Sequence, residues 1–596
     1  MSKSLHSNQD ITKLLGRLWL HLSVRRRQQF SMLLILMILS AFAEIISIGA
    51  VLPFLGVLIA PAKFFESPAV QPIIQSLGFI EPKQLLLLFT VAFGMAALLA
   101  GSSRLLLLWA STRLSFAAGA DIGANIYLRT LYQPYSVHIA RNSSEIIEGI
   151  SGKSSAVIFN AILPALTIIG SAVMIISILI ALLSIEPIVA LLSAVVFGLI
   201  YAIIIYISRN QLIANSQIAA QQSPRVIKSL QEGLGGIRDV LLDGSQATYC
   251  HIYQQADYPI RRAQGNTSFI GASPRFALEA FGMLLISVLS YSLAQQQDGV
   301  ANAIPILGGL ALGAQRLLPV LQQAYNAWSN IQGGRVSLQD TLELLDQPLP
   351  QYANQPSAQP IPFREQISAK KLSYRYGIDM PLVINNLDIT ITKGSRIGII
   401  GSTGSGKSTL VDILMSLLLP TKGMLEIDGQ PITSENYRSW QAHIAHVPQA
   451  IYLADCTIEE NIAFGISKDK INNSRVRQAA RQAQIADTIE SWPLQYQTNV
   501  GENGIRLSGG QRQRIGIARA LYKEADVIVF DEATSALDNE TEEAVMQAIE
   551  TLSDELTLVI VAHRLTTLRK CTQIVELYEG RILRTGTYQK IVTELK

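Results

Sequence analysis

The sequence predicts two domains in series: a bundle of six membrane-spanning helices and then an α/β domain that lies in water. The chain has 596 residues, more than one ordinary domain holds. Hydrophobic residues make up 49% of it and charged residues only 16%, a balance typical of segments that lie in lipid. The long apolar runs are confined to the stretch from Phe30 to about Gln323, and none follows Gln347.

Each predicted membrane span is an apolar run of roughly 20 residues or more, the length that crosses a bilayer. The runs are residues 30–60, 84–110, 157–184, 187–207, 276–294 and 303–323. The last run carries the weakest signal because it contains three glycines and Arg316. The alternative, hairpins of soluble core helices, is disfavoured by the length of the runs taken together.

Lysine and arginine predict the orientation of these spans. Basic residues are concentrated before the first run and after the second and fourth runs, whereas the opposite loops hold only Lys63 and Lys83. The basic side is expected to be cytoplasmic, and an even number of spans returns the C-terminus to that side. We therefore expect a multi-pass protein of the inner (plasma) membrane. Its expected parts are a cytoplasmic segment 1–29, a transmembrane domain 30–340, a polar, proline-rich linker 341–364 and a C-terminal domain 365–596.

Charge and cysteine content narrow the function classes further. The net charge is +3, too small for the strong basic excess of a nucleic-acid-binding protein. Cys250, Cys456 and Cys571 are isolated in the sequence, so we expect free thiols and neither a disulfide framework nor a metal cluster. Polar residues 1–29 precede the first apolar run without a cleavable signal pattern.

A glycine-rich motif predicts a phosphate-binding loop. The pattern G-x-x-x-x-G-K-S is matched by Gly401-Ser402-Thr403-Gly404-Ser405-Gly406-Lys407-Ser408. It follows the apolar run 396–400 and precedes residues 409–419, which have helical spacing and begin with Thr409. Glycines let backbone N–H groups converge on phosphates, and the helix N-terminus adds positive potential. Lys407 is expected to reach the terminal phosphates and the Ser408 hydroxyl to ligate Mg²⁺, so the predicted cofactors are ATP and Mg²⁺.

Two acids close an apolar run in the same domain. Residues 527–530 are continuously apolar and are followed by Asp531 and Glu532, as expected for a strand buried on both faces with its ligand-binding end last. Asp531 is suited to hold Mg²⁺ through water, and Glu532 to polarise an attacking water. Taken alone, the two acids are better explained as a solvated strand end, and the presence of the P-loop motif reverses this in favour of the catalytic interpretation.

The pentapeptide Leu507-Ser508-Gly509-Gly510-Gln511 is the signature of the ABC transporter family, which the chain resembles over residues 367–596. The resemblance implies that Ser508, Gly509, Gly510 and Gln511 bind ATP. It also implies that Tyr376 stacks on adenine and that Gln449 is the Q-loop glutamine, which senses Mg²⁺ and the membrane domain. Residues 535–538 resemble the D-loop, and His563 resembles the switch histidine that contacts the γ-phosphate, although a lone histidine after a strand is often structural.

The family chemistry is ATP hydrolysis coupled to transport, so the resemblance implies a translocase with Glu532, His563, Lys407 and Gln449 as its catalytic residues. In the family, the signature of one ATPase domain closes on the nucleotide of another. The chain has one P-loop and one signature, which implies two chains with ATP sandwiched between them. Because both Glu532 and His563 are present, a homodimer is expected, and a heterodimer with a different half is the alternative.

The predicted direction of transport is outward. The spans precede the ATPase in one chain, and residues 498–504 resemble the segment that exporters place before the signature. In the membrane domain, residues 43–49 with Glu44, residues 133–145 and residues 235–240 resemble PglK-like flippases of lipid-linked oligosaccharides and glycolipids. The last two stretches are expected to include coupling helices. Residues 68–79 are equally consistent with an external helix and with an ordinary loop.

Charged residues at bilayer depth are candidates for cargo binding. Arg104, Arg275 and Arg316 lie in or beside predicted spans, where they can meet an anionic head group. Their alternative is a structural role, in which they reach the cytoplasmic surface or pair with Glu44 or Glu279. The alternative is favoured for Arg275 and for Glu44, so Arg104 and Arg316 are the stronger candidates, with Glu44 beside them.

The sequence thus predicts an ABC exporter that flips a lipid-linked oligosaccharide, polysaccharide precursor or glycolipid, with membrane lipid and no nucleic acid as partners. An exporter of lipid A-like lipids, hydrophobic drugs or peptides is the nearest alternative. A soluble ABC ATPase is disfavoured by the six predicted spans. A channel or regulator is the remaining alternative class.

Overall fold

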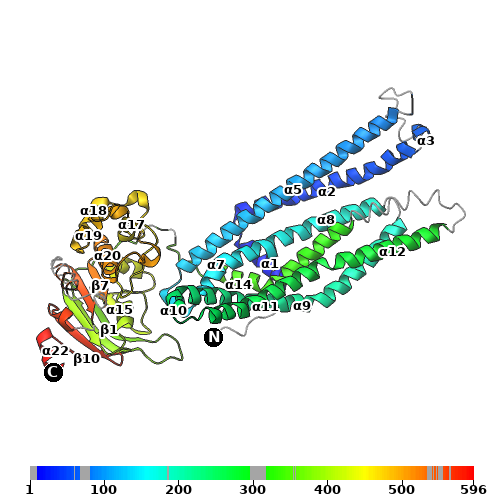
Figure 1. Ribbon diagram of the computed structural model, residues 1–596. Coiled ribbons are helices and arrows are strands. Elements are labelled where there is room, and N and C mark those ends of the chain that lie inside the picture. Colours follow the sequence, from blue (N-terminus) through cyan, green and yellow to red (C-terminus); the bar gives the residue numbers. More distant parts are fainter. Residues whose placement is uncertain are drawn as a thin grey trace. The chain divides into compact units, whose positions relative to one another are not determined.

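The computed structural model describes residues 10–59, 61–66, 81–82, 84–183, 187–294, 317–353, 355, 358–532, 540, 542–544, 547, 555–562 and 565–595. The chain forms two compact units (Figure 1). The helical unit comprises residues 1–133 and 141–350, and the α/β unit comprises residues 134–140 and 351–596. Residues 134–140 therefore interrupt the helical unit in sequence. The chain then returns to the helical unit and enters the α/β unit for the second time at residue 351.

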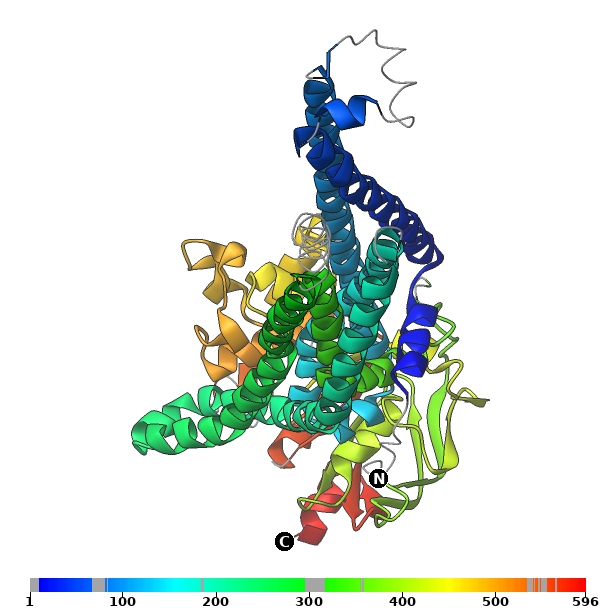
Figure 2. The ribbon, with the colours of Figure 1, turned by 90° about the vertical axis from the view of Figure 1, so that its right-hand side faces the viewer.

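The helical unit is built of long helices that run side by side (Figures 1 and 2). Its helices are α1 Ile11–His21, α2 Val24–Ile59, α3 Pro61–Phe65, α5 Gln84–Leu131, α7 Ser143–Val157, α8 Leu163–Leu183, α9 Pro187–Gly235, α10 Ile237–Leu242, α11 Gln246–Ala272, α12 Pro274–Ala294 and α14 Arg335–Leu345. A π-helical turn, Ile158–Ile162, joins α7 to α8, and residues 317–333 are also helical. Helix α14 extends into the stretch expected as the linker.

Four helices of the described part of the chain are long and apolar enough to cross a membrane, namely Val24–Leu58, Gln84–Leu131, Ser143–Ile180 and Ala194–Gly235. They overlap the first four predicted spans. The fifth predicted span corresponds to α12, a helix of 21 residues, and most of the sixth lies outside the described residues. Helix α5 has 48 residues, which at ~1.5 Å per residue is about twice the thickness of a hydrocarbon core. Helix α5 is therefore longer than one crossing of the bilayer requires.

Helices α2 and α5 pack against each other through one side of each. Leu33 and Met37 of α2 and Leu114, Ala118 and Ile122 of α5 are buried in one apolar cluster. The other sides of the same helices remain apolar and exposed, as in Leu34, Ile35, Leu105 and Leu106. A helix that is apolar on both its packed and its exposed sides is suited to lipid rather than water.

The described strands of the α/β unit form two sheets. One is four-stranded, in the order β2-β1-β4-β5, with β1 Gln366–Tyr374, β2 Ile384–Thr392, β4 Lys422–Ile427 and β5 Gln430–Pro431. The other is six-stranded, in the order β10-β9-β3-β8-β7-β6, with β3 Arg396–Gly401, β6 Ile444–Val447, β7 Val527–Asp531, β8 Thr557–Val561, β9 Gln573–Tyr578 and β10 Arg581–Gly586. Strands β3, β8, β7 and β6 are parallel neighbours, so their carboxyl ends meet at one edge, where α/β folds bind ligands.

The α/β unit also contains short helices. They are α6 Tyr135–Ala140, α15 Lys407–Leu414, α16 Tyr437–Gln441, α17 Ile458–Ile462, α18 Asn473–Gln482, α19 Ala486–Glu490, α20 Gly509–Tyr522 and α22 Tyr588–Leu595, with 3₁₀ turns at Lys468–Lys470, Gln495–Gln497, Glu502–Gly504 and Leu565–Leu568. Trp440 of α16 is fully buried, and its indole Nε1 donates a 2.8 Å hydrogen bond to Leu414 O at the end of α15. That bond fixes the end of the helix that begins at the P-loop.

The segment that leads into the α/β unit is fastened to its surface. The hydroxyls of Tyr352 and Tyr437 are hydrogen-bonded, and the Arg438 guanidinium lies 4.4 Å from the Tyr352 ring centroid. His443 Nε2 lies 2.6 Å from Ile361 O, and its Nδ1 contacts the Asp526 carboxylate. Tyr352 and residues 358–361 therefore belong structurally to the α/β unit.

Candidate nucleotide-binding site and membrane pocket

The predicted phosphate-binding loop connects β3 to α15. Strand β3 ends at Gly401, and α15 begins at Lys407. Gly404 and Gly406 have φ values of +82° and +99°, a conformation that favours glycine. A Cβ atom on Gly401 would lie 2.4 Å from Leu577 O. The glycines of the motif are therefore required by backbone geometry, and the strand-loop-helix context predicted from the sequence is present.

The loop has the polar groups that a phosphate chain requires. The buried Lys407 ammonium donates hydrogen bonds of 2.8 Å to Gly401 O and 3.0 Å to Ser402 O, which holds it folded over its own loop. Ser405 Oγ is buried and forms no hydrogen bond with the described residues. A buried donor without a partner is costly, and a phosphate oxygen would supply one. This part of the site fits the phosphates of ATP.

The two acids lie at the end of β7, separated from β3 by β8. Glu532 follows the strand with φ +50°, and its N–H donates a 3.1 Å hydrogen bond to Val561 O. Its Oε2 accepts a 2.8 Å hydrogen bond from Gln449 Nε2. The structure therefore brings the Q-loop glutamine to the expected general base.

Electrostatics at this edge of the sheet favour a bound cation. Burial raises the pKa of Asp531, and the Glu532 carboxylate raises it further while Lys407 opposes both. Burial, with a smaller contribution from Asp531, raises the pKa of Asp412 on α15 to about 6. Clustered carboxylates repel one another unless a cation joins them. Asp531 with Ser408 and Gln449 thus fits the Mg²⁺ that accompanies ATP.

Tyr376, the expected adenine-stacking residue, lies beside α15. Its hydroxyl is 2.9 Å from Thr409 Oγ1, and its ring is packed edge-on against Tyr374 at 5.1 Å. The side chain is 46% exposed, so part of the ring remains accessible to a base. Its hydrogen bond to the P-loop helix fixes where a stacked base would lie.

The signature residues form the start of α20. Ser508 is the N-cap, its Oγ accepts a 3.2 Å hydrogen bond from Gln511 N, and Gln511 Oε1 accepts a 2.8 Å bond from Ser508 N. This reciprocal pair is a capping box. Gly509 and Gly510 occupy the first turn without side chains, which leaves helix N–H groups open to an anion.

Two features of this site were missed from the sequence. One is Asp412, whose signal is a single acid within the apolar stretch 410–414. The other is the packing of α20 under the Q-loop, where a Cβ on Gly516 would lie 2.1 Å from Ile451 Cδ1. His563, the D-loop residues 535–538, Arg316 and residues 68–79 lie outside the described residues.

Helix α6 belongs to the α/β unit although it lies between two helices of the other unit in sequence. Burial raises the pKa of its Tyr135, and Asp412 and Tyr376 add to that effect. Tyr135 is therefore close to the P-loop helix and to the expected adenine-stacking residue. The first expected coupling helix thus lies in the α/β unit, whereas α10 in the second expected stretch belongs to the helical unit.

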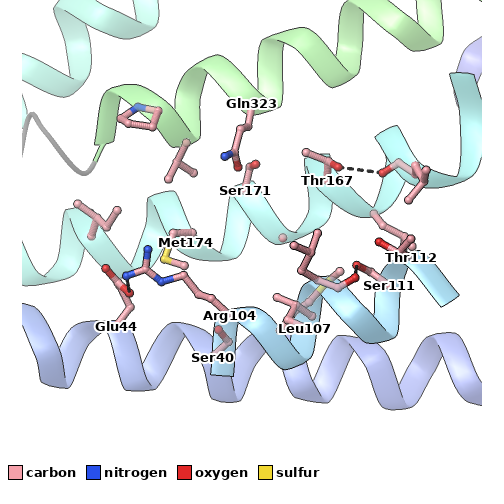
Figure 3. Close-up of a pocket in the computed structure, with 18 residues that line it drawn as sticks. Ser40, Glu44, Arg104, Leu107, Ser111, Thr112, Thr167, Ser171, Met174 and Gln323 are labelled. Atoms are coloured by element: carbon pink, nitrogen blue, oxygen red, sulfur yellow. Dashed lines mark hydrogen bonds and ion pairs between the residues drawn. The ribbon is translucent and has the colours of Figure 1, made fainter. Parts of the chain in front are cut away.

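The helical unit contains a pocket of about 510 Å³ lined by α2, α5, α8 and residues 319–323 (Figure 3). The Arg104 guanidinium of α5 lies 2.5 Å from Glu44 Oε2 of α2, and the Glu44 side chain is only 2% exposed. Polar groups face the same space from Ser40, Ser111, Thr112, Thr167, Ser171 and Gln323. Arg104 thus forms the ion pair with Glu44 that the structural alternative included, and it also lines the pocket. Arg275 pairs with Glu279 at 2.7 Å, as the structural alternative expected.

Fold and site together define a class, a membrane protein that carries its own P-loop nucleotide-binding domain. The model of the family described as ABC transporter matches residues 384–535. The chain is 30% identical over 420 residues, 70% of each chain, to the ATP-dependent lipid A-core flippase of Bordetella avium. It is 30% identical over 365 residues, 61% of each chain, to the protein of that name from Cupriavidus metallidurans. The chain belongs to the ABC transporter family.

A solved structure has the same fold along nearly the whole chain. The bacterial Atm1-family ABC exporter with ATP bound superposes with a TM-score of 0.76 and covers 96% of both chains, at 23% sequence identity. The predicted fold class, a helical membrane domain of the ABC exporter fold followed by an ABC-type α/β domain, is thereby confirmed. The lipid A-core flippases of Cupriavidus metallidurans and Ralstonia nicotianae are matched over 61% of their own length.

Proposed function

We propose that this chain is one half of an ATP-driven exporter that moves a glycolipid from the cytoplasmic to the outer leaflet of the inner membrane. The observation that carries the proposal is the covalent union of two parts. Four membrane-length helices and a pocket that contains the Arg104–Glu44 ion pair are in the same chain as a P-loop site. ATP binding and release are expected to shift the population of inward-facing and outward-facing states.

The chemical step is hydrolysis of ATP. Lys407 and the loop N–H groups hold the phosphates, and Ser408, Gln449 and Asp531 hold Mg²⁺, which when bound neutralises charge on the phosphates. Glu532 orients the attacking water and accepts its proton. His563 contacts the γ-phosphate as in the family.

The working form is proposed to be a homodimer. One chain has one P-loop and one signature, so two composite sites require two copies. Glu532 and His563 are both present, which makes both sites of a homodimer competent. At α10, Leu241 is 60% exposed and Leu242 is 76% exposed, and such apolar exposure on a helix is typical of an interface.

The proposed cargo is a lipid with a phosphorylated glycan head group. The names of the relatives favour a lipid A-type cargo, whereas the stretches at Glu44 and residues 133–145 favour a lipid-linked oligosaccharide. Both cargoes combine anionic phosphate with hydroxyl groups and acyl or prenyl chains. Arg104 suits the phosphate and the serine and threonine hydroxyls of the pocket suit the glycan.

Reconstitution into liposomes tests the proposal and separates the two cargoes. Fluorescent lipid A-type lipids and polyprenyl-pyrophosphate glycans are placed in the liposome leaflet on the side of the ATPase domain. Their movement to the opposite leaflet is followed with and without ATP. The expected result is ATP-dependent movement of at least one of them, abolished by Glu532→Gln. Movement without ATP would indicate a channel, and stimulation by hydrophobic drugs alone would favour a drug exporter.

A further inference from the structure

A second groove lies between α2 and α5, away from the pocket that holds Glu44 and Arg104. Its volume is about 430 Å³. Its floor is apolar and includes Leu33, Leu36, Ala110 and Leu114. Two arginines, Arg26 and Arg113, line it together with Trp109 and Gln29. None of its lining residues is shared with the first pocket.

The two arginines differ in how their charge is compensated. Arg26 Nε donates a 2.8 Å hydrogen bond to Asp121 Oδ2, and its NH1 donates a 3.0 Å bond to Gln29 Oε1. The Arg113 guanidinium lies 5.9 Å from the Trp109 ring centroid. Within the described part of the chain, Arg113 forms no ion pair and no hydrogen bond through its side chain, which is exposed.

The register of the two helices sets the depth of these cations. Helices α2 and α5 are antiparallel, with Arg26 beside Asp121 and Ser40 within 3.3 Å of Ser103. Arg113 therefore lies level with about Met32, next to Phe30 at the start of the apolar run of α2. Tryptophan and arginine at such a boundary are typical of the level of lipid head groups.

We propose that this groove binds an anionic glycerophospholipid of the cytoplasmic leaflet. The lipid phosphate contacts Arg113 and Arg26, and an acyl chain lies over Leu33 and Leu36. The Arg113 guanidinium is exposed at this level, and a lipid phosphate provides a partner with two matched hydrogen bonds. The only carboxylate beside these arginines in the described residues, Asp121, is already engaged by Arg26.

Charge complementarity selects an anionic over a zwitterionic lipid. A phosphatidylcholine head group carries its own cation, which would be brought next to the two arginines. A phosphatidylglycerol head group carries only the negative charge. Each basic residue near the surface is expected to favour the anionic lipid by about fivefold. The bound lipid is a component of the bilayer and is distinct from the cargo, so its binding requires neither ATP nor transport.

Quenching of Trp109 by brominated lipids tests this site directly. The full chain is placed in phosphatidylcholine nanodiscs that contain increasing fractions of dibrominated phosphatidylglycerol or dibrominated phosphatidylcholine. The signal of Trp109 is the difference between wild type and Trp109→Phe. We expect half-maximal quenching at a fraction of phosphatidylglycerol at least about fivefold lower than that of phosphatidylcholine. Arg113→Ala is expected to lower the ratio of the two half-maximal fractions about fivefold and to leave quenching by phosphatidylcholine unchanged.

Arg262→Ala is the matched control, because it removes one exposed arginine from α11, outside the groove. It is expected to retain the full preference. Equal quenching of wild type by the two lipids would overturn the proposal. Absence of quenching by either lipid would overturn it too, since a second copy of the chain would then cover the groove. The comparison of the two lipids needs only the conservative variant Trp109→Phe to fold beside the wild type.

Discussion

Gln449 Nε2 donates a 2.8 Å hydrogen bond to Glu532 Oε2. The residue expected to respond to Mg²⁺ and the residue expected to accept a proton from water are thus bonded to each other. An amide donor on a carboxylate occupies a lone pair that a water molecule would otherwise use. The other oxygen of Glu532 remains available to a water molecule, so the bond links the position of the expected base to the position of the Q-loop.

Glu532→Gln is expected to lower steady-state ATP hydrolysis by at least about 10²-fold, because the amide cannot accept a proton. ATP binding should persist, since the P-loop contacts remain. Hydrolysis and nucleotide affinity are measured on the full chain. Glu435→Gln, an exposed site on the same unit, is the control and should leave both unchanged. Hydrolysis near the wild-type rate in Glu532→Gln would remove Glu532 from its assigned role.

Gln449→Ala is expected to be less severe than Glu532→Gln, because it frees the base instead of removing it. Basal hydrolysis should fall by about tenfold or less, while stimulation by lipid cargo is lost. In Gln449→Ala/Glu532→Gln the two losses should not add, since the residues are hydrogen-bonded partners. Additive losses in this double-mutant cycle would show that the observed bond has no part in turnover.

Asp412→Asn is expected to change the pH dependence of stability. The native pKa of Asp412 is about 6 and its ordinary value is 3.8, so the native state holds the proton more tightly. The wild-type carboxyl group favours folding most below about pH 4, and this contribution is lost as the pH rises to about 6. Relative to wild type, the variant should therefore gain stability between these pH values, by up to about 3 kcal/mol.

Thermal unfolding of the full chain at a series of pH values measures this effect. Asp379→Asn is the control because Asp379 lies on an exposed loop of the same unit. A difference between Asp412→Asn and wild type that stays constant from about pH 4 to about pH 8 would contradict the raised pKa.

Gly516→Ala is expected to destabilise the α/β unit by about 1–3 kcal/mol. The new methyl group would lie 2.1 Å from Ile451 Cδ1, so either α20 or the Q-loop must shift. Gly516→Ala/Ile451→Ala should recover much of the loss, because the smaller side chain leaves room. Chemical unfolding of the four members of this cycle measures the coupling energy, and a value near zero would contradict the packing.

Arg104→Gln is expected to destabilise the helical unit more than Glu44→Gln does. Loss of Arg104 leaves a carboxylate that is only 2% exposed without its charged partner, at a cost of about 3–5 kcal/mol. Loss of Glu44 leaves a guanidinium whose side chain is 47% exposed. Thermal unfolding in lipid nanodiscs measures both, and the double variant should be closer to Glu44→Gln than to Arg104→Gln. The reverse order would contradict this account.

The apolar runs predicted the membrane helices but not their full length. Helix α5 continues to Leu131 and α9 to Gly235. The apolar runs do not extend that far, because outside the bilayer a helix needs only one apolar side to pack. The P-loop and the acids after β7 were predictable because their chemistry is local in sequence. The neighbours of Asp412 were not, since the parallel order of β3, β8 and β7 brings Asp531 near it. Glu44 was one of the alternatives that the sequence offered for Arg104, and the antiparallel register of α2 and α5 places the two side chains together.

Helix α6 has a consequence for force transmission. The chain enters the α/β unit at Pro134 and leaves it after Ala140, so the last turn of α5 and the first turn of α7 are tied to the same six-residue anchor. Any displacement of that anchor must pull on both helices at once. The membrane-length helices Gln84–Leu131 and Ser143–Ile180 thus share one covalent attachment to the α/β unit.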